Sequence, residues 1–360
     1  MIVMAEPVIS YPGAKWRFWT HIKPYIPRNI KDWREPFFGG GSMSLSIADD
    51  PDFDLDRMVV GDLAPEIWAM WTGMRDNAPD VIEIATRWFK DWCPTQPEFS
   101  NMDKDAITRV REYEQKFKDS KSNSTFINWA VTNISNPDIV DDIKLYETAV
   151  AEGKKFWDWA EKVDCTTLSI PERAARTYLV NKISFSGMGD SGSMSKDRIW
   201  GFKLEHMDKI LAAQPLLKKM EIYNQSFEKT MSDVDRDRTF VFLDPPYYKQ
   251  EASGLYGRGG DTHHGFPHDK FAQITKDTNC RWFITYDDSI KVRQMFKGKC
   301  AYNMKRPGAP GKCYILPFTI PGGYTMAGKT SEDALAGEEL FIANYDIING
   351  ETGDEVGFDF

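Results

Sequence analysis

The chain of 360 residues is poor in the residues that build metal sites and disulfide frameworks. Its five cysteines, at positions 93, 165, 280, 300 and 313, form no CxxC pair and do not cluster with the five histidines. This spacing disfavours a zinc site or a disulfide scaffold, so we expect no metal and a reducing, cytoplasmic environment. The longest apolar runs, such as Thr239 to Leu243, are far shorter than the roughly 20 residues of a membrane-spanning helix. We therefore expect no membrane association.

An excess of basic residues is also missing. Lys and Arg number 45 against 54 Asp and Glu, which gives a net charge of −9 and, for the whole chain, argues against a nucleic-acid binder. Nine of the acids lie in residues 332–360, which contain no Lys or Arg, so the rest of the chain is balanced at 45 against 45. A local basic face that binds a polyanion is therefore compatible with the acidic total.

The order of apolar and polar segments predicts the fold. Residues 1–85 and 236–360 alternate short apolar runs with helix-like segments, which is typical of an α/β sheet with helices on both faces. Residues 86–235 are polar with scattered aromatics and are predicted to form an inserted, mostly helical region. The strands expected from this pattern are 57–62, 240–243, 281–286, 301–304, 314–320 and 339–345. Ligands of such sheets bind at the carboxyl ends of the strands.

The strongest local motif follows one of these strands. The apolar run 240–243 ends at Asp244-Pro245-Pro246-Tyr247, and proline cannot continue a sheet ladder. The two rigid prolines allow the Asp244 carboxylate and the Pro245 carbonyl to face one point as paired hydrogen-bond acceptors, beside the flat ring of Tyr247. Two acceptors and a stacking face suit the exocyclic amino group of a planar base such as adenine. A surface turn is the simpler alternative.

A glycine-rich segment forms the second motif. Pro36-Phe37-Phe38-Gly39-Gly40-Gly41-Ser42 lets the backbone approach a ligand closely before a helix begins, but it is neither GxGxxG nor a phosphate-binding loop with lysine. Asp62 ends the next strand about 20 residues later, where an acid commonly binds ribose hydroxyls. A helix cap is the competing interpretation of Asp62. Near the N-terminus, Tyr11 and Lys15 could clamp a ligand, although a solvated lysine is the simpler interpretation.

Taken together, these motifs resemble the Dam family of DNA adenine-N6 methyltransferases. The chain has an aromatic-x-G-x-K turn, PFxGGG, a strand ending in Asp, a middle region and DPPY, in the order of that family. Two further segments fit the resemblance. Residues 178–187 are similar to the family's YLNRxxFNGL segment, and residues 339–345 are similar to its ELLIxNY strand.

The resemblance implies a Rossmann-like methyltransferase sheet, S-adenosylmethionine as cofactor and DNA as partner, without an obligate protein partner. It also implies a bacterial or phage origin, and residues 86–235 as the target-recognition region. Asp244 and Pro245 would hold the amino group of a flipped adenine, and Tyr247 would stack on the base. The residues implied for cofactor binding are Tyr11, Lys15, Phe38, Gly39, Gly40, Gly41, Asp62 and Asp244, and those for nucleic acid are Asn181, Lys182, Ser186, Lys196 and Arg198.

The chain departs from the family in two places. The segment from Trp88 to Ile170 is longer than in compact members, and residues 186–193 replace the Asn-Gly-Leu hairpin with a glycine-serine loop that we expect to be flexible. The target sequence is therefore left open. Methylation of cytosine N4 or of RNA, and a catalytically silent nucleic-acid binder, stay as alternatives. Cytosine-C5 methylation is disfavoured because it needs a cysteine nucleophile and the chain has no Pro-Cys dipeptide.

Overall fold

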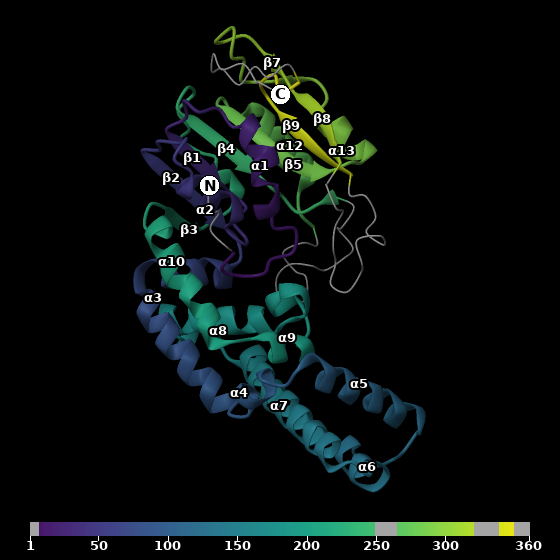
Figure 1. Ribbon diagram of the computed structural model, residues 1–360. Coiled ribbons are helices and arrows are strands. Elements are labelled where there is room, and N and C mark those ends of the chain that lie inside the picture. The colour runs from purple at the N-terminus through teal and green to yellow at the C-terminus, as the bar shows by residue number, and fades with distance from the viewer. Residues whose placement is uncertain (1–6, 249–264, 320–337, 349–360) are drawn as a thin grey trace.

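A seven-stranded sheet organises the part of the chain that the computed structural model describes, residues 7–248, 265–319 and 338–348 (Figure 1). Its order is β3-β2-β1-β4-β5-β9-β8. Strands β1 to β5 run parallel, whereas β9 is antiparallel to both β5 and β8. The strands are β1 Asp32–Glu35, β2 Arg57–Asp62, β3 Glu221–Asn224, β4 Thr239–Leu243, β5 Arg281–Asp287, β8 Tyr314–Thr319 and β9 Glu338–Ala343. This confirms the predicted α/β, Rossmann-like sheet.

Helices cover both faces of the sheet because successive side chains of each strand point to opposite sides. In β4, Phe240 and Phe242 join the core beneath one face, and Val241 and Leu243 join the core beneath the other. The first core is closed by α1 (Trp19–Ile22), α2 (Ser42–Asp49), α3 (Pro65–Trp92) and α10 (Asp208–Leu217). The second is closed by α11 (Phe227–Thr230), α12 (His268–Asp277) and α13 (Ile290–Met295). Strands buried on both sides explain the unbroken apolar sequence of β4.

A helical region is inserted between β2 and β3. Figure 1 shows α8 running beside α3, and α5 to α7 projecting from the rest of the chain as a hairpin with α6 at its tip. The helices are α4 Gln96–Ser100, α5 Lys104–Asp119, α6 Phe126–Asn133, α7 Pro137–Lys162, α8 Ile170–Ile183 and α9 Lys196–Gly201. Asp103 caps α5 by accepting from the Ala106 N–H at 2.6 Å. Within the described residues, no helix combines the length and the apolar character needed to cross a bilayer.

Two details of the sequence prediction need correction. Strand β3 falls within residues 86–235 but belongs to the central sheet, where β2 is its one neighbour among the described strands. The strand expected at 301–304 is absent from the described structure, and a two-residue strand β6 (Lys299–Cys300) pairs instead with β7 (Gly311–Lys312). The physical reason is Asn303, whose side-chain oxygen accepts from the backbone N–H groups of Lys305 and Arg306 at 3.1 Å each and bends the chain into a turn.

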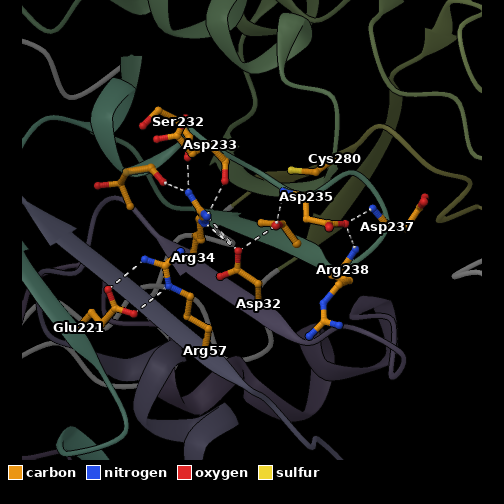
Figure 2. Close-up of polar contacts among 12 residues, drawn as sticks. Asp32, Arg34, Arg57, Glu221, Ser232, Asp233, Asp235, Asp237, Arg238 and Cys280 are labelled. Atoms are coloured by element: carbon orange, nitrogen blue, oxygen red, sulfur yellow. Dashed lines mark hydrogen bonds and ion pairs between the residues drawn. The ribbon is translucent and has the colours of Figure 1, made fainter.

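A buried arginine ties β1 to the segment that enters β4 (Figure 2). The Arg34 guanidinium donates to the Asp32 carboxylate at 2.9 Å and to the backbone carbonyls of Thr230, Ser232 and Asp233. Arg34 is only 4% exposed, so these acceptors replace the water that a guanidinium needs. The contacts therefore fix the connection from α11 to β4, the strand that precedes Asp244.

Candidate active site

Acidic residues gather at the carboxyl edge of the sheet. Glu35, Asp62 and Asp287 are the last residues of β1, β2 and β5, and Asp244 follows the last residue of β4. The parallel strands bring these positions to one edge. The strand order reverses between β1 and β4, and ligands of open α/β sheets bind at such a switch point. The DPPY and glycine motifs thus meet where the fold predicts a ligand.

Asp244 is held by a buried cation. Both of its carboxylate oxygens accept from the Lys15 ammonium at 3.0 Å, and Oδ1 also accepts from the Thr285 hydroxyl at 2.8 Å. Lys15 is 2% exposed, and its ammonium also donates to the Gly13 carbonyl at 2.9 Å. A turn with Gly13 at φ 74° brings Lys15 to this position. The backbone N–H of Lys15 donates to the Ser42 hydroxyl. The solvated lysine considered from sequence is therefore wrong.

The tyrosine of DPPY lies inside this edge. The Tyr247 hydroxyl donates to Glu339 Oε1 at 2.6 Å, and the Lys15 ammonium lies 5.1 Å from the centre of the Tyr247 ring. Tyr247 is 9% exposed, and the preceding Pro245 is buried. In this conformation one face of the ring is therefore turned to Lys15, and the rigid prolines hold the chain against the sheet.

The glycine bend is built around Asp62 and Tyr11. The two Asp62 oxygens accept from the Gly39 N–H and from the Ala64 N–H, each at 2.8 Å. A Cβ placed on Gly39 or Gly40 would approach a carbon of the Tyr11 side chain to 2.7 Å, so the packing requires glycine there. Burial raises the pKa of Asp62 to about 6, against the opposing effect of its two N–H donors.

Aromatic residues support the bend from beneath. The Trp71 indole N–H donates to the Gly39 carbonyl at 2.8 Å, and the buried Phe38 ring lies 5.3 Å from the Trp71 ring, centre to centre. Gly41, at φ 69°, precedes helix α2 in a left-handed conformation that glycine adopts without strain. The bend thus places main-chain groups and the start of α2 at the switch point.

Two acids of the site escaped the sequence analysis as functional residues. Glu339 is 2% exposed and lies 3.7 Å from the Lys15 ammonium, in addition to its bond from Tyr247. Burial raises the pKa of Glu339. Glu35 is also buried, and burial raises its pKa to about 8, with the nearby Asp244 and Asp62 contributing. Glu339 lies in the quoted segment 339–345 and Glu35 directly precedes the glycine-rich segment, but only their positions at strand ends could have signalled a role.

Two of the residues predicted to contact nucleic acid, Asn181 and Lys182, instead form hydrogen bonds to the protein backbone. The buried Asn181 side chain donates to the Ser10 carbonyl at 2.6 Å and accepts from the Ser10 N–H at 3.2 Å. The Lys182 ammonium donates to the Val8 carbonyl at 2.6 Å, and burial lowers its pKa to about 8. Both residues therefore tie α8 to the segment that leads into the Tyr11 turn. Direct contact with DNA, as expected from sequence, does not suit their positions.

Of the other three predicted residues, Lys196 and Arg198 are partly exposed, whereas the Ser186 hydroxyl is buried. Arg198 reaches the Ser10 hydroxyl at 3.3 Å, and Lys196 pairs with Glu114 at 2.9 Å. Ser186 has a left-handed φ of 53° within the segment that was expected to be flexible. That segment folds back as a hairpin, with an antiparallel bridge between Ser184 and Met194 at its base. A buried ion pair between Arg176 and Asp190, at 2.6 Å, holds its far end.

The sheet order, the helices on both faces and the motifs at the carboxyl edge define a methyltransferase with a Rossmann-like fold. The chain belongs to the D12 class of N6 adenine-specific DNA methyltransferases, whose family model matches residues 11–309. It is also similar to the Type II methyltransferase M1.LlaDCHI of Lactococcus lactis subsp. cremoris, with 20% identity over 299 residues, 81% of this chain and 76% of the relative. These findings confirm the predicted family and activity, N6 methylation of adenine in DNA.

Membership in this family implies S-adenosylmethionine as the methyl donor. The residues at the switch point fit such a molecule. A glycine bend that no larger residue can replace lets main-chain groups approach a ligand, and Asp62 stands at the end of β2 where ribose hydroxyls are commonly bound. The buried Lys15 and the surrounding carboxylates suit a ligand that carries both an amino and a carboxyl group.

Proposed function

We propose that Asp244 and the Pro245 carbonyl hold the N6 amino group of an adenine that has left the DNA helix, with Tyr247 against the base. The single observation that supports this most strongly is the position of Asp244. Its carboxylate stands at the switch point of the sheet, 22% exposed, with a buried lysine and a threonine on its inner side. Oδ1 accepts from both neighbours and Oδ2 from Lys15 alone, so Oδ2 retains acceptor capacity for an amino N–H.

The cofactor would lie across the neighbouring strand ends. We assign its ribose to Asp62 and its amino-acid part to the turn that carries Tyr11 and Lys15, with Phe38 and Gly39 to Gly41 forming the wall between them. Asp62 already bridges the Gly39 and Ala64 N–H groups, so it positions the bend as well as facing the ligand. When bound, S-adenosylmethionine supplies a methyl group on a sulfonium sulfur, which leaves with the bonding electrons.

The residues of the chain would make the amino group reactive. The lone pair of adenine N6 is delocalised into the ring, which makes it a poor nucleophile. Two acceptors, Asp244 Oδ2 and the Pro245 carbonyl, draw the N–H bonds out of the ring plane and so free the lone pair for the methyl group. The proton that N6 loses would pass to the Asp244 carboxylate. Positioning and preorganised charge thus carry the catalysis, and no covalent enzyme intermediate is needed.

DNA would be bound by the inserted region. We propose residues 86–235, apart from β3, as the target-recognition region, with Lys196 and Arg198 as contacts to DNA; the Ser186 hydroxyl is buried and is left out of this set. Asn181 and Lys182 would act by fixing the Tyr11 turn, because their side chains are used inside the protein. Extruding the base from the duplex costs roughly a few kcal/mol, which contacts of this region would offset.

A methyl-transfer assay tests the assignment. Purified enzyme is incubated with genomic DNA and labelled S-adenosylmethionine, and the product nucleosides are separated by mass spectrometry. We expect N6-methyladenine, and a loss of at least about a thousandfold in rate for Asp244→Ala. The matched control is Asp54→Ala, which removes an exposed aspartate and should leave the rate unchanged.

Each outcome decides one part of the proposal. Full activity in a folded Asp244→Ala variant would contradict the role of Asp244. N4-methylcytosine as the product, or transfer to RNA alone, would contradict adenine in DNA as the substrate. Sequencing of the modified positions in the same DNA gives the target sequence, which later experiments require.

A further inference from the structure

Two carboxylates lie on neighbouring strands beside Tyr247 and Tyr248, in the loop 244–248 that follows β4. In the antiparallel ladder between β5 and β9, Asp287 pairs directly with Glu339, so both side chains point to the same face of the sheet. Asp287 is 5% exposed and Glu339 is 2% exposed. Both stand at the edge of the sheet that carries Asp244. We refer to Asp287 and Glu339 as the strand-end pair.

The strand-end pair contacts successive residues of the same loop. Glu339 Oε1 accepts from the Tyr247 hydroxyl at 2.6 Å, and Asp287 Oδ1 accepts from the Tyr248 backbone N–H at 2.7 Å. The loop leaves the sheet from β4, but these two contacts come from β5 and β9. Strand β9 therefore holds the side chain of Tyr247, and strand β5 holds the main chain of Tyr248. Neither strand is the one from which the loop begins.

This arrangement is costly for stability alone. Like charges placed directly opposite each other on a sheet repel, and burial penalises an ionised carboxylate. The Lys15 ammonium, 3.7 Å from Glu339 and 3.0 Å from Asp244, offsets part of this cost and links the pair to the catalytic carboxylate. A hydrophobic pair at the same two positions would avoid this repulsion but would remove the acceptors of the Tyr247 hydroxyl and the Tyr248 N–H. The two carboxylates therefore hold successive residues of the loop that carries Tyr247, which points to a role in the reaction.

We propose that Glu339 and Asp287 are positioning residues for methyl transfer: Glu339 sets the plane of the Tyr247 ring and Asp287 sets the main chain behind it. This inference rests on the proposed function, in which Tyr247 lies against the extruded adenine. Glu339 contacts both the ring hydroxyl and the cation of Asp244, so it fixes the distance between the two groups that hold the base. It touches neither base nor methyl donor and acts only through Tyr247 and Lys15.

Three variants separate this role from a structural one. Tyr247→Phe keeps the ring and removes only the hydroxyl that bonds to Glu339. Glu339→Leu removes the acceptor, and Glu339→Gln restores a neutral acceptor of the same size. The control is Asp288→Asn, which changes the neighbouring acid, paired with Arg293. Each is measured on duplex DNA that contains the target sequence found by sequencing, with wild-type enzyme and Asp244→Ala run in parallel.

The expected result is a split between turnover and binding. We expect kcat to fall by about 10- to 100-fold in Tyr247→Phe and Glu339→Leu, as for loss of a hydrogen bond to a charged group, with partial rescue in Glu339→Gln. KM for S-adenosylmethionine should stay within about twofold in Tyr247→Phe, because this change leaves the contact between Lys15 and Glu339 in place. The double variant Tyr247→Phe/Glu339→Leu should be no slower than the slower single variant, because both changes remove one interaction.

A fluorescent base gives an independent readout. With 2-aminopurine in place of the target adenine, the variants should change the emission of the bound complex, since a displaced ring stacks differently on the base. Wild-type kcat and wild-type emission in folded Glu339→Leu, or additive losses in the double variant, would overturn the inference. Activity retained by Asp244→Ala would instead overturn the proposed function, so the two failures are distinguishable.

Discussion

The pH dependence of stability should report on Glu35. This residue ends β1, is 3% exposed, and its Oε2 accepts from the Ser44 N–H at 2.9 Å and from the Ser44 hydroxyl. Its carboxyl thereby caps the first turn of α2 from inside the protein. Burial raises its pKa from the usual 4.5 to about 8. Glu35→Gln keeps the size and an acceptor for the Ser44 N–H but cannot ionise.

The sign of the effect follows from the two pKa values. The folded protein holds a proton on Glu35 up to pH of about 8, whereas the unfolded chain releases it near 4.5, so the folded state binds more protons in that interval. The free energy of unfolding therefore falls as pH rises through the interval, by about 1.4 kcal/mol for each pH unit. The full cost at high pH is roughly 5 kcal/mol, an upper bound. Below the lower value the cost disappears.

Urea unfolding followed by tryptophan fluorescence measures this cost. We expect the free energy of unfolding of wild type to fall between acidic and mildly basic pH, whereas Glu35→Gln lacks this loss. The variant should therefore gain a few kcal/mol relative to wild type over this pH range. Glu161→Gln, a change at an exposed glutamate, should follow the wild-type curve at all pH values. Parallel curves for wild type and Glu35→Gln would refute the assignment of a neutral, buried Glu35.

Three further predictions concern stability, cofactor binding and DNA binding. Arg34→Ala should lower the free energy of unfolding by about 3–5 kcal/mol, because it leaves buried acceptors unpaired. Arg57→Ala breaks an exposed ion pair and should cost about 0–1 kcal/mol (Figure 2). Equal losses for the two variants in urea unfolding would contradict this. Gly39→Ala puts a Cβ 2.7 Å from Tyr11 at φ +42° and should weaken S-adenosylmethionine binding at least about tenfold in calorimetry. Gly201→Ala, whose Cβ meets nothing within 4 Å, should not, and similar affinities for the two would argue against the glycine bend as the binding wall. DNA affinity should fall with added salt, and Arg198→Ala should reduce the slope of log affinity against log salt by about 0.9. An unchanged slope, measured by fluorescence anisotropy, would show that Arg198 does not contact a phosphate.

Local signals predicted most of the sheet. The strand at 57–62 has the predicted bounds, and β4 and β5 begin or end within one residue of the expected positions. The inner residues of these strands are buried on both faces, so each strand contains an apolar run that stands out in the sequence. Strand β1 was missed because three of its four residues are charged, although all four are buried. Strand β3 was missed because it is a four-residue edge strand with a single buried residue. Its pairing with β2 supplies the stability that its own sequence does not show.

The site was only partly predictable for a different reason. Asp244, Lys15 and the glycine bend each lie in a short contiguous motif that can be recognised in the sequence, and the structure brings all three together. The partners of Asp244 and Tyr247 come from strands delivered by distant sequence: Thr285 from β5 and Glu339 from β9. No local pattern indicates which of many threonines or acids will face a given carboxylate. Such residues become visible only when strand order and register are known.

The contact between Lys15 and Glu339 joins positions 324 residues apart, almost the length of the chain. During synthesis on the ribosome, the N-terminal turn and the glycine bend emerge long before strand β9 can insert beside β5. The pocket that we propose for the base is therefore completed only after strand β9 has been translated. A prematurely terminated chain would lack the acceptor of Tyr247, so unfinished copies of this enzyme would be poorly equipped to modify DNA.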